Sequence, residues 1–197
     1  MARQPIQDRS KKTLDRILDA AELILNEKKW PDLTIQEIVK RAKSSIGSFY
    51  ARFDGKHDLL SALSSRLSEQ VEEEFLRFQM QSVDLPPRIY VERTIAELIR
   101  FHHERRGVIR ALTLVPRLDD TTSLRADGLR NAEIFSALSH RLAEISTDLE
   151  KTTLALFVVS MAIREAVVFP EVAGPLISIN HERLAKELAD ILFSYLE

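Results

Sequence analysis

Apolar residues recur along most of this chain with the period of an α-helix. In the first such stretch, from about Ser10 to Glu27, they form a single stripe made of Leu14, Ile17, Leu18, Ala21, Ile24 and Leu25. Similar stripes predict helices over about 56–82, 88–104, 107–115, 124–145, 149–169 and 181–196. The five glycines and seven prolines are too few for a turn-rich all-β chain. We therefore predict an all-α fold.

Two short helices are predicted between the first and second of these stretches. Pro31 ends the preceding helical region, and Thr34 with Glu37 forms a capping box for a helix that buries Ile35, Ile38, Val39 and Ala42. After the turn "KSS", Ser45 can cap a second helix from Ile46 to about Arg52. Two helices joined by so short a turn are typical of a helix-turn-helix.

The order of these elements predicts two domains. Residues 1–55 would form a three-helix head, and residues 56–197 a larger helical domain that begins with a long stalk helix over about 56–82. The segment "DLPP", residues 84–87, marks the clearest hinge. We expect about nine helices in all.

The segment from Thr34 to Leu60 resembles the DNA-binding signature of the TetR family of bacterial transcriptional regulators. The residues that carry this resemblance are Thr34, Ile35, Ile38, Val39, Ala42, Ser45, Gly47, Ser48, Phe49, Tyr50, Phe53, Lys56, Leu59 and Leu60. The resemblance covers roughly the first 60 residues, and beyond them only the helical layout is similar. It implies a sequence-specific regulator, most often a repressor, with a C-terminal domain for ligand binding and dimerisation.

Two departures from the family pattern concern glycine. Lys43 stands where the family usually has a turn glycine, and Lys28 or Lys29 where a glycine usually follows the first helix. A residue with a side chain that adopts positive φ costs of order 1 kcal/mol. Ser44 also replaces a frequent valine.

The resemblance places the DNA contacts in and around the second short helix. Small side chains there would let the helix approach base edges, while Phe49 and Phe53 anchor it from behind. The predicted base contacts are Gln36, Ser44, Ser45, Ile46, Gly47, Ser48 and Arg52. The predicted phosphate contacts are Thr34, Tyr50, Lys56 and, on an N-terminal arm that also carries Arg3, the side chains of Arg9, Lys11 and Lys12. Taken alone, these serines and this glycine could be merely solvated positions or a close helix contact.

The charge distribution agrees with a basic head. Residues 1–60 hold 12 Lys and Arg against 9 Asp and Glu, a net charge of +3, which leaves −5 for the remainder. With no cysteine, neither a disulfide framework nor a thiolate metal site is available. No signal peptide is visible, and the apolar stretch Leu154 to Ile163 is too short to span a bilayer, so we expect a cytoplasmic protein without a membrane partner.

A homodimer is expected, because one head makes few contacts to a near-palindromic operator. The apolar segments "LALFVVSMAIREAVVF" and "LAKELADILFSYL" in the last two helices are the expected dimer interface, or else part of the protein's own core. The family also implies an unknown small-molecule effector. Its candidate pocket residues, which could equally be plain core, are Phe101, His102, His103, Leu112, Phe135, Leu138, Phe157, Met161 and Arg164.

Two other function classes have some support in the sequence. The stretch "FHHERR", residues 101–106, suggests a metal-dependent enzyme, but adjacent histidines on a helix point about 100° apart and the H-E-x-x-H spacing is absent. No catalytic residue, metal or cofactor is therefore predicted. A helical protein-binding adaptor that has lost DNA binding is the other alternative, and Lys43 is the residue that favours it.

Overall fold

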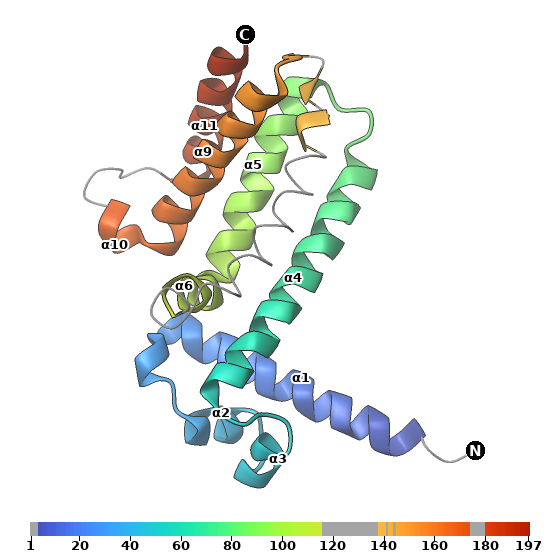
Figure 1. Ribbon diagram of the computed structural model, residues 1–197, viewed down its shortest axis with the longest axis vertical. Coiled ribbons are helices and arrows are strands. Elements are labelled where there is room, and N and C mark those ends of the chain that lie inside the picture. Colours follow the sequence, from blue (N-terminus) through green and yellow to red (C-terminus); the bar gives the residue numbers. More distant parts are fainter. Residues whose placement is uncertain (1–3, 116–137, 141, 144, 174–179) are drawn as a thin grey trace. The chain divides into compact units, whose positions relative to one another are not determined.

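Helices account for the secondary structure of the computed structural model, which describes residues 4–115, 138–140, 142–143, 145–173 and 180–197, with side chains from Ser10 onward. These residues form nine α-helices and one 3-10 helix and contain no strand (Figure 1). The all-α prediction is confirmed. The predicted helix over 124–145 lies largely outside the described residues.

The chain divides into two compact units that are not contiguous in sequence. Unit 1 contains Met1–Glu69 and Gly107–Val115, and unit 2 contains Gln70–Arg106 and Pro116–Glu197. Helix α4 (Lys56–Gln81) corresponds to the predicted stalk helix and contributes its first part to unit 1 and its last part to unit 2. Unit 1 also contains most of α6 (Arg106–Leu114), which the sequence placed in the second domain. The domain boundary at residue 55 stays a prediction.

Unit 1 begins with a longer helix than expected. Helix α1 spans Gln4–Glu27, so the prediction of a start near Ser10 is wrong. Pro5 lies in the first turn, where its missing N–H removes no helical hydrogen bond, and the helix can begin before it reaches the apolar stripe. Arg9, Lys11 and Lys12 consequently lie on a helix and not on an extended arm.

The remaining elements of unit 1 are η1 (Trp30–Asp32), α2 (Ile35–Arg41), α3 (Ile46–Tyr50), the start of α4 and α6. Their shared core contains Ile17, Ala21, Leu33, Ile38, Phe49, Phe53, Leu59, Leu63, Val108 and Ala111. Helix α6 approaches α1 so closely that a Cβ at Gly107 would lie 2.3 Å from the backbone carbonyl of Leu25. The Gly107 N–H also donates to Asn26 Oδ1 at 3.0 Å. Only glycine permits this contact.

Unit 2 is built mainly from α5 (Pro87–Glu104), α9 (Leu149–Val168) and α11 (His181–Leu196), which pack side by side (Figure 1). Their core contains Tyr90, Val91, Ile95, Ile99, Leu156, Val159, Ile163, Leu184, Leu188 and Leu192. The predicted bounds of all three helices agree with the structure to within one residue. Between two of the predicted helices, Pro170–Ala173 forms the short helix α10, with proline at its first position.

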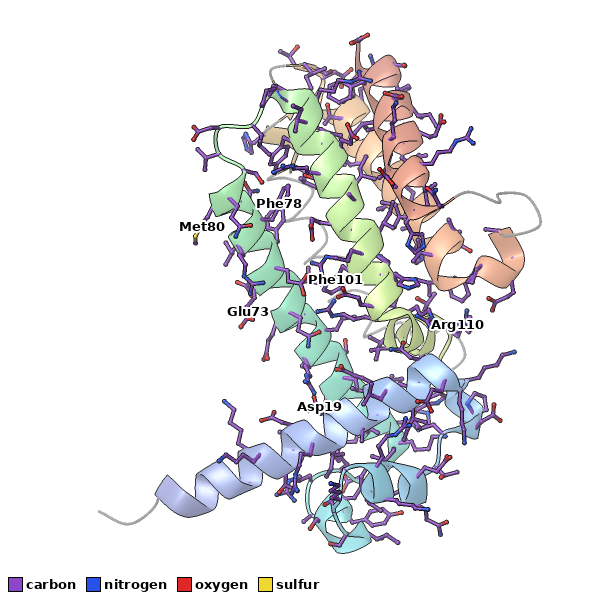
Figure 2. All side chains as sticks on the ribbon, turned by 180° about the vertical axis from the view of Figure 1, so that it is seen from behind. Asp19, Glu73, Phe78, Met80, Phe101 and Arg110 are labelled. Carbon is purple, nitrogen blue, oxygen red and sulfur yellow. The ribbon has the colours of Figure 1, made fainter. Side chains whose placement is uncertain are left out.

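The last part of α4 packs on α5 within unit 2. In Figure 2, Phe78 points from α4 toward α5, whereas Glu73 and Met80 point the other way. The rings of Phe78 and Tyr90 have centroids 5.5 Å apart. At the other end of α5, Arg105 donates to Glu74 Oε1 at 2.6 Å and to Gln70 Oε1 at 2.8 Å. The last part of α4 is therefore held to α5 by both apolar and ionic contacts.

Among the described residues, no helix is both long enough and apolar enough to cross a bilayer.

Candidate nucleic-acid interface and ligand cavity

Helix α2 starts at the residue that the capping box predicted. Thr34 Oγ1 accepts a hydrogen bond from the Glu37 N–H at 3.2 Å and donates to Glu37 Oε2 at 3.1 Å. The Lys28 ammonium also binds the Glu37 carboxylate, and this hydrogen bond is the main reason why the pKa of Glu37 lies below its usual value. These contacts fix the start of α2 by local chemistry.

The turn between α2 and α3 has the strained residue that the sequence suggested. Lys43 has a φ of 48°, the only positive value among the described non-glycine residues. The Ser44 N–H donates to Val39 O at 2.9 Å. The Ser44 hydroxyl oxygen is buried and has no hydrogen-bond partner among the described residues, so it is not exposed for the predicted base contact.

Helix α3 is short and anchored from behind. Ser45 is its N-cap, and its Oγ accepts from the Ser48 N–H at 3.1 Å and donates to Ser48 Oγ at 3.0 Å. Phe49 is fully buried, and its ring centroid lies 5.1 Å from that of Phe53. The helix ends at Tyr50, two residues before the predicted end. The aromatic pair holds α3 against the core of unit 1.

The opposite side of α3 is exposed. Ile46 and Tyr50 have 48% and 54% of their surface accessible, respectively, although both are large and largely apolar. Gly47 lies between them and is also exposed. A Cβ added at Gly47 would meet only Ser45 Oγ, at 4.0 Å, and its φ is not positive. Nothing inside the protein therefore requires a glycine here.

The other predicted base contacts differ in how free their side chains are. Gln36 is exposed on α2. Arg52, by contrast, donates from Nη1 to Ser48 O at 2.7 Å and from Nη2 to Ser10 Oγ at 3.1 Å. This placement favours a role for Arg52 in holding α3 to α1. A base contact by Arg52 stays a prediction, and it would require these bonds to break.

The predicted phosphate contacts show a similar division. Thr34, Tyr50, Lys11 and Lys12 are exposed, and the side chain of Arg9 and the whole of Arg3 lie outside the described part of the structure. Lys56 donates to Trp30 O at 3.0 Å and lies over the Trp30 ring, 5.0 Å from its centroid. Burial lowers the pKa of Lys56. Lys56 therefore stabilises η1 at the start of α4.

Sequence reasoning missed two exposed cations beside the turn, Lys40 and Lys43. Lys43 was considered only as a departure from glycine. Its place directly before α3 could have identified it, because a side chain at this turn is available to a phosphate next to the helix. We add both lysines to the candidate phosphate contacts.

Known proteins resemble this chain both in sequence and in structure. Residues 17–63 match the family model of the bacterial regulatory proteins, tetR family. This match contains the whole of α2, the turn and α3. The helix-turn-helix segment is therefore similar to that of the TetR family. No curated relative matches the sequence.

Solved structures share the fold of this chain over more than nine tenths of its length. The regulator FadR from Bacillus subtilis, in complex with stearoyl-CoA, has a TM-score of 0.69 and 17% identity over 91% of this chain and 97% of its own. A transcriptional regulator from Rhodococcus sp. Rha1 has a TM-score of 0.71 and 17% identity over 92% and 96%. A putative TetR-family regulator from Syntrophomonas wolfei str. Goettingen has a TM-score of 0.66 and 14% identity over 94% and 95%. At these identities the likeness establishes the fold alone.

The TetR-like fold of this chain has an apolar cavity in unit 2. It lies among α5, α9 and α11 and is small, with a volume of about 20 Å³, which is room for about one water molecule. Its lining includes Tyr90, Thr94, Leu98, Leu138, Ser160 and Leu192. Thr94 Oγ1 donates to Tyr90 O and Ser160 Oγ to Phe157 O, both at 2.8 Å. Among the described residues, no charged side chain lines it.

Of the predicted pocket residues that the structure describes, only Leu138 lines this cavity. Leu112 packs in the core of unit 1 because α6 belongs there, and Phe157 is 50% exposed on the outer side of α9. Phe101 is buried under the Arg105 guanidinium, 4.1 Å from its ring centroid. Four others have different positions: His102, Arg164 and Met161 are half-buried, and His103 is exposed with its ring centroid 4.7 Å from that of His181. Phe135 lies outside the described residues.

The last helix and α9 each have two apolar sides. One side lies in the core of unit 2, as with Val159 and Ile163 on α9 and Leu188 and Leu192 on α11. On the other side, an outer stripe remains about half exposed, formed by Leu154, Phe157, Val158, Ile191 and Tyr195. The structure therefore places one side of each helix in the protein's own core, and a dimer interface on the other side stays a prediction.

Proposed function

We propose that this protein is a sequence-specific DNA-binding transcriptional regulator, acting as a homodimeric repressor that a small, largely apolar ligand releases from DNA. The family of the helix-turn-helix segment and the fold of the whole chain support this proposal. The observation that carries the proposal is the outer side of α3. There an exposed glycine, Gly47, lies between the exposed side chains of Ile46 and Tyr50, and no contact within the described residues requires it to be glycine.

The chemistry of that side suits the major groove. Glycine within a helix costs about 0.5–1 kcal/mol relative to alanine, so a position that accepts alanine without a clash gains nothing in the fold from remaining glycine. A need for α3 to approach a base pair closely would explain why the position is glycine. Ile46 can then contact a thymine methyl group, and the Ser48 hydroxyl can donate to a base acceptor.

Two heads are needed for useful affinity. The outer stripe of α9 and α11 is an apolar surface of the kind that two protomers bury in a four-helix interface. A two-fold dimer places its recognition helices about 34–36 Å apart, one turn of DNA, and thus reads a near-palindrome.

The apolar interior around the small cavity in unit 2 is the proposed effector site, and side chains there would have to move to admit a ligand. Its lining is apolar, which favours a ligand with an apolar body. The complex of FadR with stearoyl-CoA shows that one protein of this fold binds a ligand with a long apolar chain. A ligand that binds the DNA-free conformation more tightly than the DNA-bound one shifts the protein toward release from DNA. The free energy of this shift cannot exceed the difference between the ligand's two binding free energies.

Salt dependence of DNA binding tests the proposal directly. We expect the purified protein to bind duplex DNA, with affinity falling by roughly a thousandfold or more between about 50 and about 200 mM salt if six or more phosphates are contacted. Tyr50→Ala should weaken binding to all duplexes alike, whereas Gln36→Ala should change which duplex is preferred.

Lys186→Ala is a matched control, because Lys186 is exposed on α11 in unit 2 and carries the same charge as the lysines of the head. The control should bind DNA as the wild type does. Two results would refute the proposed interface and favour a protein-binding adaptor. One is that the protein does not bind DNA, and the other is that Lys186→Ala weakens DNA binding as much as Tyr50→Ala does.

A further inference from the structure

One histidine of the "FHHERR" stretch has a partner on another helix. His103, in the last turn of α5, and His181, the first residue of α11, have ring centroids 4.7 Å apart, with their ring planes at 71°. Neighbours in a helical sequence point about 100° apart, so His102 and His103 do not share an ion. The structure instead pairs His103 with a histidine far along the chain, which the sequence alone does not show.

Core packing fixes the backbone on both sides of this pair. His103 follows the buried Ile99 by one helical turn, and His181 precedes the buried Ala185 by one turn. Helices α5 and α11 pack against each other in opposite directions (Figure 1), and an ion pair between Arg88 and Asp190 joins their other ends. The two imidazoles thus extend from packed helices, which hold a site more precisely than loops do.

Both imidazoles can present a nitrogen lone pair. The two side chains are exposed, and neither ring forms a hydrogen bond with another residue in the part of the chain that the structure describes. Partial desolvation is the main cause that lowers the pKa of His181, and the charge of His103 lowers it further. A lowered pKa favours the neutral imidazole, which is the form that binds metal ions.

The separation of the two rings suits one shared metal ion. An imidazole nitrogen binds Zn²⁺ at about 2.0–2.1 Å, which puts the ion about 3.2 Å from the ring centroid. Two imidazoles on one ion then have centroids about 5.2 Å apart at a tetrahedral angle, and about 4.5 Å apart at the right angle of a square-planar ion. The observed 4.7 Å lies between these two values.

The ligand types define the class of ion. Within the described residues, no group of three or more His, Cys, Asp or Glu could hold a metal, so the protein would supply two ligands and water the rest. The neighbouring Glu104 is paired with Arg100 and Arg105. Imidazole suits Cu²⁺, Ni²⁺ and Zn²⁺, whereas Mg²⁺ and Ca²⁺ prefer oxygen ligands.

We propose that His103 and His181 form a surface site for one divalent transition-metal ion of the copper, nickel and zinc class. The bound ion joins the end of α5 to the start of α11. Neither histidine lines the apolar cavity, and the site does not depend on the DNA-binding function proposed above. Because the site needs both helices in place, the ion binds the folded protein more tightly than the unfolded chain and stabilises it.

Calorimetric titration of the full chain without an affinity tag tests the inference, with Cu²⁺, Ni²⁺, Zn²⁺ and Mg²⁺ as probes. We expect one transition-metal ion per chain, Cu²⁺ bound most tightly and Mg²⁺ not bound. His103→Gln and His181→Gln should each weaken Ni²⁺ binding at least about tenfold. The double variant should be no more than about twofold weaker than either single variant, because one remaining imidazole no longer chelates the ion.

His140→Gln is the matched control, because His140 is another exposed histidine of unit 2. It should bind Ni²⁺ as the wild type does. No Ni²⁺ binding by the wild type below about 1 mM would leave only an edge-to-face ring contact and overturn the inference. Binding that both single variants retain would place the ion elsewhere and overturn it as well.

Thermal unfolding of the wild type gives a second measurement that needs no variant to fold. Ni²⁺ in excess should raise Tm, and a chelator should reverse the rise. The same amount of Mg²⁺ should leave Tm unchanged. A Tm that Ni²⁺ does not raise would contradict a site that joins the two helices.

Discussion

Gly47→Ala offers a test in which stability and DNA binding should change in opposite directions. The added methyl group points to the outer side of α3, where its nearest neighbour is Ser45 Oγ at 4.0 Å, an ordinary van der Waals distance. The backbone of Gly47 is helical, with no positive φ. The substitution therefore introduces neither a clash nor strain within the protein.

The magnitude follows from helix propensity. Glycine in a helix interior costs about 0.5–1 kcal/mol relative to alanine, and Gly47 is in the first turn, so we expect a gain of about 0.5 kcal/mol. For a chain of this size, that raises Tm by about 1–2 °C. On DNA, the same methyl group would hold the helix away from the base edges and cost at least about 1.4 kcal/mol, a tenfold loss of affinity.

Thermal unfolding and fluorescence anisotropy with a labelled duplex measure the two effects. Ser65→Ala is the matched control, because Ser65 is exposed on α4 and its hydroxyl only donates to Ser61 O at 3.2 Å. This control should also gain a little stability and keep its DNA affinity. A Gly47→Ala protein that is stabilised and still binds DNA as the wild type does would refute the assignment of α3 to the groove.

Three further predictions concern the turn, the α4–α5 contact and the dimer. Lys43→Gly should raise the free energy of unfolding by about 1 kcal/mol in urea titrations, because it relieves a φ of 48°; a loss would contradict the strain. Arg105→Met should lower the free energy of unfolding by about 1–2 kcal/mol in the same assay, because the bonds to Glu74 are lost. An unchanged free energy of unfolding would show that solvent already screens the ion pair. Phe157→Glu should give a monomer in sedimentation equilibrium at micromolar concentration, and a persisting dimer would exclude the outer stripe of α9 as the interface.

Local signals made the helix-turn-helix predictable. Thr34 and Ser45 cap their helices through residues three positions away, and the Phe49–Phe53 pair lies one helical turn apart. Each of these features depends on only a few consecutive residues, so it can be recognised in the sequence. The start of α1 also had a local signal in Pro5, but the apolar stripe begins later and led the prediction to Ser10.

Contacts between distant segments could not be predicted. Arg52 is bonded to Ser10, 42 residues away, and Gly107 meets Asn26, 81 residues away. An arginine near a recognition helix therefore suggested a base contact, although its partners lie on α1. Likewise, the sequence of α6 does not reveal that Leu112 packs in unit 1 and not near the cavity, because an amphipathic pattern shows which side of a helix is buried but not against what.

Selection of bound sequences from a pool of random duplex DNA tests the central claim most directly. The account predicts enrichment of a near-palindromic sequence whose half-sites lie about one helical turn, or a multiple of it, apart, and loss of that enrichment in Gly47→Ala. A pool that stays unenriched, or the same sequence enriched equally by the wild type and the variant, would contradict the claim that the outer side of α3 reads DNA.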